Sequence, residues 1–330
     1  MSSTPLVSIV IPVFNGEQFI RTALESVAAQ TYPSIEIIAV DDGSTDSSVD
    51  VVNSFGRDVL LVRQPNRGVA AARNEAIARA RGEFIAFLDQ DDWWLPRKLE
   101  EQVSLCRNDP RIGLVHTNVS YYDDELGQYV GLLNPSTRSD QLVGDCFDKL
   151  LLGNGLYNSA VLVRRSLVEQ VGPCDLRIPG NTVQDYDLWL RCARNTHFGH
   201  VKDPLTVLRL HPAQGLWKRA EMLREELNVL LRYRPENEWF GTLEGRMRLS
   251  ALHDELAAAY LDRNDTRSAR THFAKSWQAY RSTRQLARLV LSCLPLGIIR
   301  VLQGAKQRVS TYAQRDHPSK HATPSREHVA

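Results

Sequence analysis

The sequence predicts an α/β protein in which a mostly parallel sheet with flanking helices is followed by a helical region. Two observations predict this fold class. Short apolar runs typical of buried strands alternate with stretches whose apolar residues recur at helical spacing. Acidic and polar clusters directly follow three of these runs. Alternating strands and helices favour a parallel sheet covered on both faces, and such sheets bind ligands outside the carboxyl ends of their strands.

Composition narrows the class of protein. The 330 residues are 43% hydrophobic and 24% charged, which is typical of a globular protein. A formal net charge of +1 gives no indication of a nucleic-acid partner. The five cysteines are far apart and form no CxxC pair, and the first residues lack the basic start and cleavage site of a signal peptide. We therefore expect free thiols in a reducing, cytoplasmic compartment.

The first ninety residues contain four predicted strands and three predicted helices. The predicted strands are Val7–Ile11, Ile35–Val40, Val59–Val62 and Phe84–Leu88. Asn15 and Gln18 form a variant of the capping box that begins helices, and the helix they start should end at Tyr32-Pro33. A short helix-like stretch carries Val49 and Val52. An alanine-rich helix should run from Val69 to about Arg81, with Gly82 as its C-terminal stop.

Three polar clusters follow these strands at one predicted rim: 12–15, 41–46 and 89–92. If the chain stays extended through Gln90, Asp89 and Asp91 point to the same side. Two carboxylates there repel each other unless a cation lies between them, and their oxygens suit magnesium, manganese or calcium. The alternative is a solvated acidic turn before a helix. Asp92 and the two tryptophans after it have no assigned role.

Each residue also has a purely structural interpretation. Asn15 can be only a helix cap, and Asp42 can belong only to a turn. Arg73 can lie on the polar face of a surface helix, although a position near a helix N-terminus beside Gly68 also suits a phosphate. Gly43 and Gly68 stand singly, so the sequence supports neither a P-loop nor a dinucleotide-binding motif.

Four stretches in this order resemble family 2 glycosyltransferases, which are nucleotide-sugar enzymes of the GT-A fold. They are VSIVIPVFNG, IEIIAVDDGSTDSS, NRGVAAARNEAIARARGEFIAFLDQDD and VQDYDLWLR, and they cover roughly residues 6 to 212. The resemblance implies that Asp42 binds the nucleotide base and that Arg73 lies near the nucleotide and its phosphates. It makes Asp89 and Asp91 a DxD motif, with Asp89 toward the ribose and Asp91 on a divalent metal, Mn or Mg. Pro12 and Asn15 complete the predicted nucleotide-sugar site.

The resemblance also implies a catalytic base near residue 185. Most relatives have Glu-Asp where this chain has Gln184-Asp185, so we assign the base to Asp185, with Asp187 as the lesser candidate. His211 matches the family's closing segment, where a histidine can approach the metal or the diphosphate; a structural histidine is the equal alternative. Relatives often have GGFD where this chain has residues 172–175, GPCD, so the acceptor is harder to infer.

Beyond the predicted catalytic domain, residues 1–213, the alternation stops. Residues 214–312 predict helices, and the apolar positions Leu256, Ala257, Tyr260, Ala269 and Phe273 match one tetratricopeptide-like helix pair. The apolar segment Leu286–Leu302 fits either an anionic membrane surface or a buried helix. Residues 313–330 have the composition of a disordered tail.

Together with the resemblance, these observations predict an inverting glycosyltransferase that moves a sugar from a nucleotide-diphosphate donor to a hydroxyl of a glycan or lipid-linked glycan. We expect the donor to be a UDP-sugar. We expect it to act in cell-surface polysaccharide biosynthesis, in the cytoplasm or at the inner face of the membrane. A metal-dependent nucleotidyltransferase and a non-catalytic nucleotide-sugar-binding scaffold are the alternatives.

Overall fold

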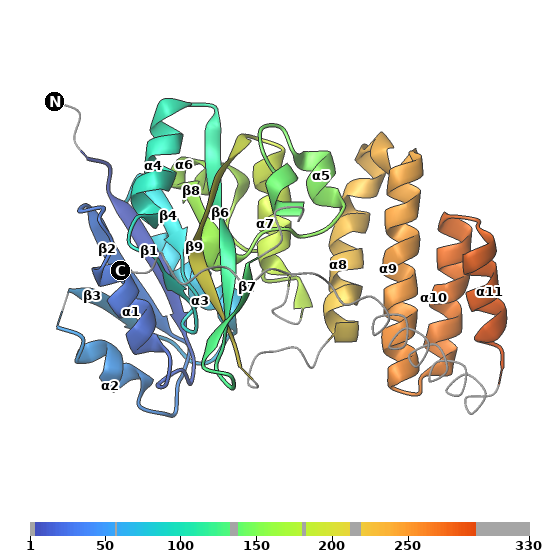
Figure 1. Cartoon of the computed structure of the whole chain (residues 1–330), viewed down its shortest axis with the longest axis horizontal. Coiled ribbons are helices and arrows are strands. Elements are labelled where there is room, and N and C mark those ends of the chain that lie inside the picture. Colours follow the sequence, from blue (N-terminus) through green and yellow to red (C-terminus); the bar gives the residue numbers. More distant parts are fainter. Residues whose placement is uncertain (1–3, 57, 133–137, 180–182, 212–218, 295–330) are drawn as a thin grey trace, which may run out of the picture. The chain divides into compact units, whose positions relative to one another are not determined.

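A computed structural model describes residues 4–56, 58–132, 138–179, 183–211 and 219–294 (Figure 1). The chain divides into two compact units, residues 1–245 and 246–330. The first unit contains all the strands of the described residues: β1 (Val7–Val13), β2 (Ile35–Asp41), β3 (Val59–Arg63), β4 (Phe84–Phe87), β5 (Trp93–Trp94), β6 (Ile112–Asp123), β7 (Gln128–Leu132), β8 (Val161–Arg164) and β9 (His197–Leu210).

The helices of the first unit lie between these strands or follow them. They are α1 (Ile20–Ala28), α2 (Ser48–Asn53), α3 (Val69–Arg79), α4 (Lys98–Asn108), α5 (Phe147–Leu151), α6 (Arg165–Val171), α7 (Gln184–Ala193) and α8 (Arg219–Tyr233). A short 3-10 turn, Asn158–Ala160, precedes β8. The first unit therefore includes α8.

All the strands belong to one mixed sheet with the order β3-β2-β1-β4-β8-β6-β9-β5, and β7 pairs with β6. The strands β3, β2, β1 and β4 are parallel. The strand β8 runs antiparallel to both β4 and β6, whereas β6 and β9 are parallel. The predicted α/β class and the parallel first half of the sheet are confirmed, and the second half is mixed.

Apolar side chains cover both faces of β1, as expected for a strand buried on both sides. On one face, alternate residues such as Ile9 and Ile11 share a core with Leu24 of α1 and Leu99 of α4. On the other face, α3 packs on β1 and β2. The ring of Phe87, the last residue of β4, contacts the buried ring of Trp189 in α7, with centroids 5.5 Å apart. These contacts fix the ends of β1, β2 and β4 relative to α3 and α7.

Two predicted helix boundaries differ from the structure. The helix α1 begins at Ile20 and has no side-chain cap, so the predicted capping box of Asn15 and Gln18 is wrong. The helix α3 ends at Arg79, before Gly82. Gly82 is required because β1 passes close by: a Cβ there would lie 2.7 Å from the carbonyl oxygen of Leu6 and 2.7 Å from the amide nitrogen of Ser8.

In the second unit, the described residues are helical, in agreement with the predicted helical C-terminal region. The helix α9 (Leu243–Asp262) begins in the first unit and continues past the boundary after Gly245, and it is followed by α10 (Thr266–Ala279) and α11 (Thr283–Leu291). Ala257, Ala269 and Phe273 form a buried cluster, as the helix-pair pattern predicts. No helix among the described residues is long and apolar enough to cross a bilayer. The predicted tail and residues 295–302 of the predicted apolar segment lie outside the described residues, whereas the first residues of that segment belong to α11.

Candidate active site

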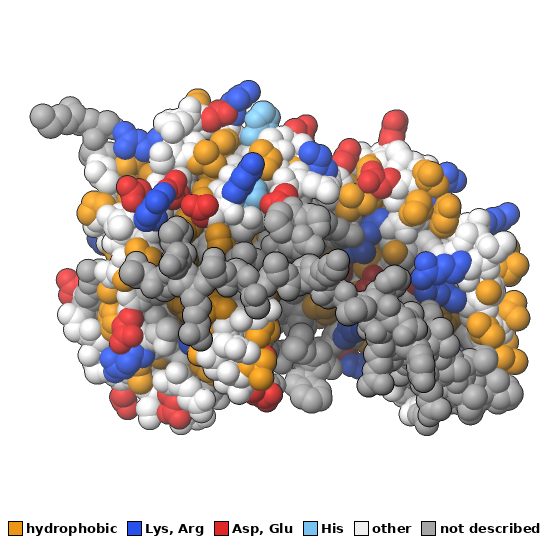
Figure 2. Space-filling view, viewed as in Figure 1, with side chains coloured by type: hydrophobic (Ala, Val, Ile, Leu, Met, Phe, Trp, Pro, Cys, Tyr) orange, Lys and Arg blue, Asp and Glu red, His pale blue; other side chains and the backbone are white. Residues whose placement is uncertain are grey.

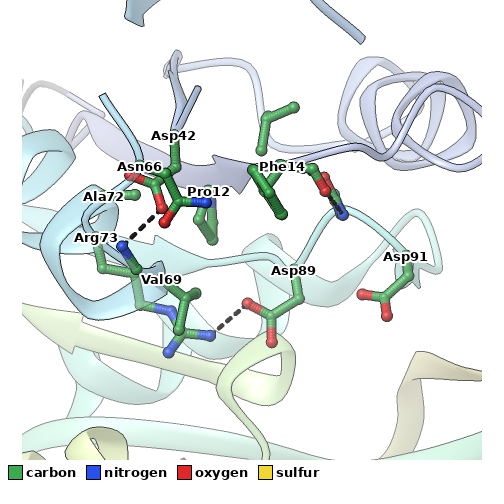
Figure 3. Close-up of a pocket in the computed structure, with 12 residues that line it drawn as sticks. Pro12, Phe14, Asp42, Asn66, Val69, Ala72, Arg73, Asp89 and Asp91 are labelled. Carbon is green, nitrogen blue, oxygen red and sulfur yellow. Dashed lines mark hydrogen bonds and ion pairs between the residues drawn. The ribbon is translucent and has the colours of Figure 1, made fainter. Parts of the chain in front are cut away.

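The ends of β1, β2 and β4 border a cavity of about 410 Å³ (Figure 3). The first turn of α3 closes one side of this cavity. Its lining includes Pro12, Asp42, Arg73, Asp89 and Asp91, which are five of the eight residues predicted for the site. The rule that ligands bind at the carboxyl ends of parallel strands therefore located the cavity correctly.

Asp42 is buried at the end of β2 and its carboxylate is fully engaged. Oδ1 accepts hydrogen bonds from Gln64 Nε2 at 2.6 Å and from the Arg67 amide at 2.8 Å. Oδ2 accepts one from the Gly68 amide at 2.8 Å. Asp42 therefore fixes the loop that leads into α3, in which Asn66 and Gly68 line the cavity.

Asn15 lies outside the cavity lining. Its backbone is left-handed, with φ of 46°, and its Oδ1 accepts a hydrogen bond from the Thr45 amide at 2.9 Å. Its own amide donates to Ser44 Oγ at 3.0 Å. Asparagine tolerates this backbone conformation better than most residues. The contacts of Asn15 tie the loop after β1 to the loop after β2.

Arg73 projects from the first turns of α3 and is 7% exposed. Its Nη2 forms an ion pair with Asp89 Oδ1 at 2.6 Å (Figure 3). Burial disfavours the charged guanidinium, but the negative charges of Asp89 and Asp185 raise the pKa of Arg73 above its usual value. The Nε of Arg73 has no hydrogen-bond partner within the described part of the chain. A buried cation with a spare donor at this cavity suits an anionic ligand.

The chain turns at Gln90 and Asp91, so the extended conformation that would place Asp89 and Asp91 on one side does not occur. The two carboxylates have separate partners instead. Asp91 Oδ2 lies 3.1 Å from His211 Nε2, and the Arg209 Nε donates to the Asp91 carbonyl at 3.0 Å. Gln90 exchanges two hydrogen bonds with the Phe14 backbone, which tie the turn to the end of β1.

The Asp91 and His211 pair fits a divalent cation. Two adjacent ligands of an octahedral ion at about 2.1 Å lie about 3 Å apart, which is close to the observed separation. A magnesium-like ion typically takes one or two carboxylates and completes its coordination with phosphate oxygens and water. Among the described residues no cluster of three or more His, Cys, Asp or Glu side chains could hold a metal by itself. The residues present therefore fit a metal that takes its remaining ligands from water or from a bound ligand.

Asp185 lies in the first turn of α7 and is not among the residues that line the cavity, but the charges of Arg73 and Asp89 act on its carboxyl. Its Oδ2 accepts a hydrogen bond from Asn158 Nδ2 at 3.2 Å, and its Oδ1 accepts one from the Tyr186 amide at 2.7 Å. Burial raises the pKa of Asp185, and the nearby charge of Arg73 opposes this rise. A raised pKa improves the ability of a carboxylate to take up a proton.

Asp187, the lesser candidate for the base, has a different environment. It is buried, and its Oδ2 accepts a hydrogen bond from Arg191 Nε at 2.9 Å. The guanidinium of Arg191 also donates to the carbonyls of residues 171–173. This network attaches the loop after α6 to α7, which is a structural task.

Sequence reasoning missed three residues behind the cavity. Asp92 is buried, and burial together with the charges of Asp91 and Asp89 raises its pKa well above the usual value. Ser159 and Asn158 contact Asp92 and Asp185, respectively. Asp92 could have been suspected as the third acid of a triplet, but no local pattern marks residues 158 and 159.

Comparisons with known proteins identify the class. A family model, Glycosyl transferase family 2, matches residues 8–171. The chain is 36% identical over 259 residues to the putative glycosyltransferase EpsH of Bacillus subtilis, covering 72% of this chain and 74% of EpsH. It is 31% identical to an uncharacterized glycosyltransferase of Rickettsia felis, of which it spans 37%. The chain belongs to glycosyltransferase family 2.

Solved structures agree on the fold. The mannosyltransferase PcManGT of Pyrobaculum calidifontis, in complex with GDP-Man and Mn²⁺, has a TM-score of 0.61 at 19% identity, covering 88% of this chain and 79% of that chain. Residues 1–349 of S. aureus TarS, in complex with UDP-GlcNAc, give 0.62 at 16% identity, covering 90% and 87%. The GT-A fold is therefore confirmed, and the protein is a glycosyltransferase. The nucleotidyltransferase and scaffold alternatives are not supported.

Proposed function

We propose that this enzyme transfers a sugar from a nucleotide-diphosphate donor, with UDP as the preferred nucleotide, to a hydroxyl of a glycan or lipid-linked glycan, with inversion at the anomeric carbon. One arrangement carries the proposal. Asp42, Arg73, Asp89 and Asp91 border one cavity, while Asp185 lies beside Arg73 at the edge of the same site. This arrangement supports a proton acceptor beside a binding site for an anionic donor.

Each side chain has a task in the proposed reaction. Asp42 and the loop that it fixes receive the nucleotide base, Asp89 the ribose, and Arg73 a phosphate. Pro12 lines the cavity wall, and Asn15 keeps the neighbouring loops in place. Asp91 and His211 would hold Mn²⁺ or Mg²⁺, which neutralises charge on the diphosphate as it leaves. Asp185 accepts the proton of the acceptor hydroxyl while the new carbon–oxygen bond forms and the bond to the diphosphate breaks.

The nucleotide and the metal are supported by structural neighbours. TarS is in complex with UDP in one structure and with UDP-GlcNAc in another, whereas PcManGT is in complex with GDP-Man and Mn²⁺. A thermal-shift screen of UDP-, GDP-, dTDP- and CMP-sugars, with and without Mn²⁺, tests the donor. A ligand at 100 times its Kd stabilises the native state by about 2.7 kcal/mol. The largest shift should come from a UDP-sugar with Mn²⁺; no shift from any donor contradicts the proposed function.

We also propose that the enzyme works in polysaccharide biosynthesis at the cytoplasmic membrane surface, which its C-terminal region contacts. The exposed side chains of Leu286, Val290 and Leu291 on α11 support this contact, and hydrophobic side chains are visible over this helix in Figure 2. Basic residues Arg281 and Arg284 are nearby in the chain. Co-sedimentation with vesicles containing anionic lipid should exceed that with neutral vesicles, and Val290→Glu should reduce it.

A further inference from the structure

We propose that Asp92 and Ser159 form a positioning pair that holds the donor-side carboxylates in place relative to the base Asp185. This inference rests on the proposed function. Asp92 is 6% exposed and is absent from the cavity lining, although Asp89 and Asp91 both border the cavity. It therefore acts on the reaction only through other residues.

Asp92 connects three separate segments of the chain. Its Oδ2 accepts a hydrogen bond from Ser159 Oγ at 2.5 Å, in the 3-10 turn before β8. Its Oδ1 accepts one from the Arg209 amide at 3.1 Å, near the end of β9. Asp92 itself belongs to the acidic turn after β4. These two hydrogen bonds join the acidic turn to the 3-10 turn and to β9.

Ser159 binds the acidic turn at both of its ends. Its Oγ donates to Asp92 and also accepts a hydrogen bond from the Asp89 amide at 3.1 Å. Its carbonyl oxygen accepts a further hydrogen bond from Trp94 Nε1 at 2.7 Å. The side chain is fully buried. One hydroxyl group therefore sets the distance between the first and last residues of the turn.

The segments that Asp92 and Ser159 join also contact the proposed metal-binding residues and the proposed base. Asn158, which precedes Ser159, donates to Asp185 at 3.2 Å. Arg209, whose amide contacts Asp92, lies two residues before His211, and His211 contacts Asp91. The pair thus links the proposed metal-binding residues to the proposed base. A misplacement of about 1 Å between reacting groups can cost about 10²-fold in rate.

The burial of Asp92 is not explained by an ion pair. No Lys, Arg or His side chain within the described residues forms a salt bridge with its carboxylate, and the charges of Asp91 and Asp89 act against its ionisation. Burying a carboxylate without a cation is unfavourable. If the side chain at position 92 only filled space, an apolar residue would serve. The two hydrogen bonds that Asp92 accepts need two oxygen atoms at fixed positions, which an apolar side chain cannot supply.

Three variants test the pair. Ser159→Ala removes the hydroxyl that contacts Asp92 and Asp89. Asp92→Ala removes both acceptors, whereas Asp92→Asn keeps the shape and the acceptor for the Arg209 amide. Ser250→Ala is the matched control, because Ser250 is equally buried and its hydroxyl is hydrogen-bonded to Ser276 at 2.8 Å in the second unit.

The measurements are the affinity for UDP with and without Mn²⁺, by calorimetry, and kcat and KM for donor turnover. Ser159→Ala and Asp92→Ala should each reduce the gain in UDP affinity from Mn²⁺ by about 10-fold, a typical effect of removing support from a metal ligand. Affinity for UDP without Mn²⁺ should stay within about threefold, because Asp42 and its loop are untouched. The kcat should fall about 10²-fold, and Asp92→Asn should recover at least tenfold of that loss.

The two residues should act as one unit. The double variant Asp92→Ala/Ser159→Ala should lose less than the two single losses combined, because both single variants break the hydrogen bond between Ser159 Oγ and Asp92 Oδ2. Additive losses, or single variants that behave like Ser250→Ala, would overturn the inference. If Asp92→Ala and Ser159→Ala do not fold, Asp92→Asn decides. A smaller gain in UDP affinity from Mn²⁺, with metal-free UDP affinity unchanged, supports the inference, and values like those of Ser250→Ala overturn it. A failure of the proposed function can be told apart from a failure of this inference, because it would be visible in the wild type. In that case Mn²⁺ would not change the UDP affinity of the wild type, and no turnover would occur.

Discussion

The donor side and the base side of the site surround their carboxylates differently. On the donor side, Asp89 is paired with Arg73 at 2.6 Å, and Asp91 lies 3.1 Å from His211. On the base side, Asp185 accepts hydrogen bonds from an amide side chain and a backbone amide, and no salt bridge to it occurs among the described residues. Burial raises the pKa of Asp185, which suits a group that takes up a proton, whereas the carboxylates of Asp89 and Asp91 face partners that suit the binding of a charged ligand. The same residue type thus suits two tasks.

The largest effect should come from the donor side. Asp91→Ala removes the proposed carboxylate ligand, so metal-dependent turnover should fall at least 10³-fold and Mn²⁺ should no longer raise the affinity for UDP. Donor turnover and calorimetry measure both effects. Asp109→Asn is the control, because Asp109 forms an ion pair with Arg111 at 2.7 Å outside the cavity. Retention of the Mn²⁺ effect in Asp91→Ala would show that the ion binds elsewhere.

The next largest effect should come from the base side, with a different pattern. Asp185→Asn keeps the side-chain shape but cannot accept the proton, so kcat should fall by about 10²- to 10⁴-fold. UDP affinity in the presence of Mn²⁺ should stay within about threefold of the wild type. Transfer rates with saturating donor, beside UDP titrations, separate the two quantities. Full transferase activity in this variant would disprove the assignment of the base.

The two sides also differ in how far the sequence predicts them. Asp42, Asp89 and Asp91 follow their strands directly, so strand patterns and the rim rule were enough to bring them together. Arg73 lies in α3, and only the resemblance to the family implied its place beside them. The mutual placement of Asp89 and Asp91 was wrong, because a hydrogen bond from the Asp92 amide to the Asp89 carbonyl bends the chain there. On the base side, the partner of Asp185 comes from residue 158, and no periodicity or spacing encodes a contact between segments so far apart in the chain.

Arg73 links the two sides electrostatically, and its removal should change the pH dependence. Its charge lowers the pKa of Asp185 against the effect of burial, while Asp89 raises it. In Arg73→Gln the pKa of Asp185 should therefore rise further. Because Asp185 must be ionised to act as a base, the acid limb of the kcat–pH profile should move to higher pH. The profile is measured with saturating donor, and an unmoved or lowered acid limb would contradict the link.

The smallest catalytic effect should come from Asp187, two residues from the proposed base. Its carboxylate contacts Arg191 at 2.9 Å and lies 3.7 Å from Arg232, so it holds α7 to neighbouring segments. Asp187→Asn weakens a charge-assisted hydrogen bond, and the free energy of unfolding should fall by about 1.5–3 kcal/mol. The kcat of the folded protein should change less than threefold. Denaturant unfolding and transfer rates at a temperature where the variant is folded measure the two effects. A loss of kcat as large as that of Asp185→Asn, without a loss of stability, would assign the proton transfer to Asp187 instead.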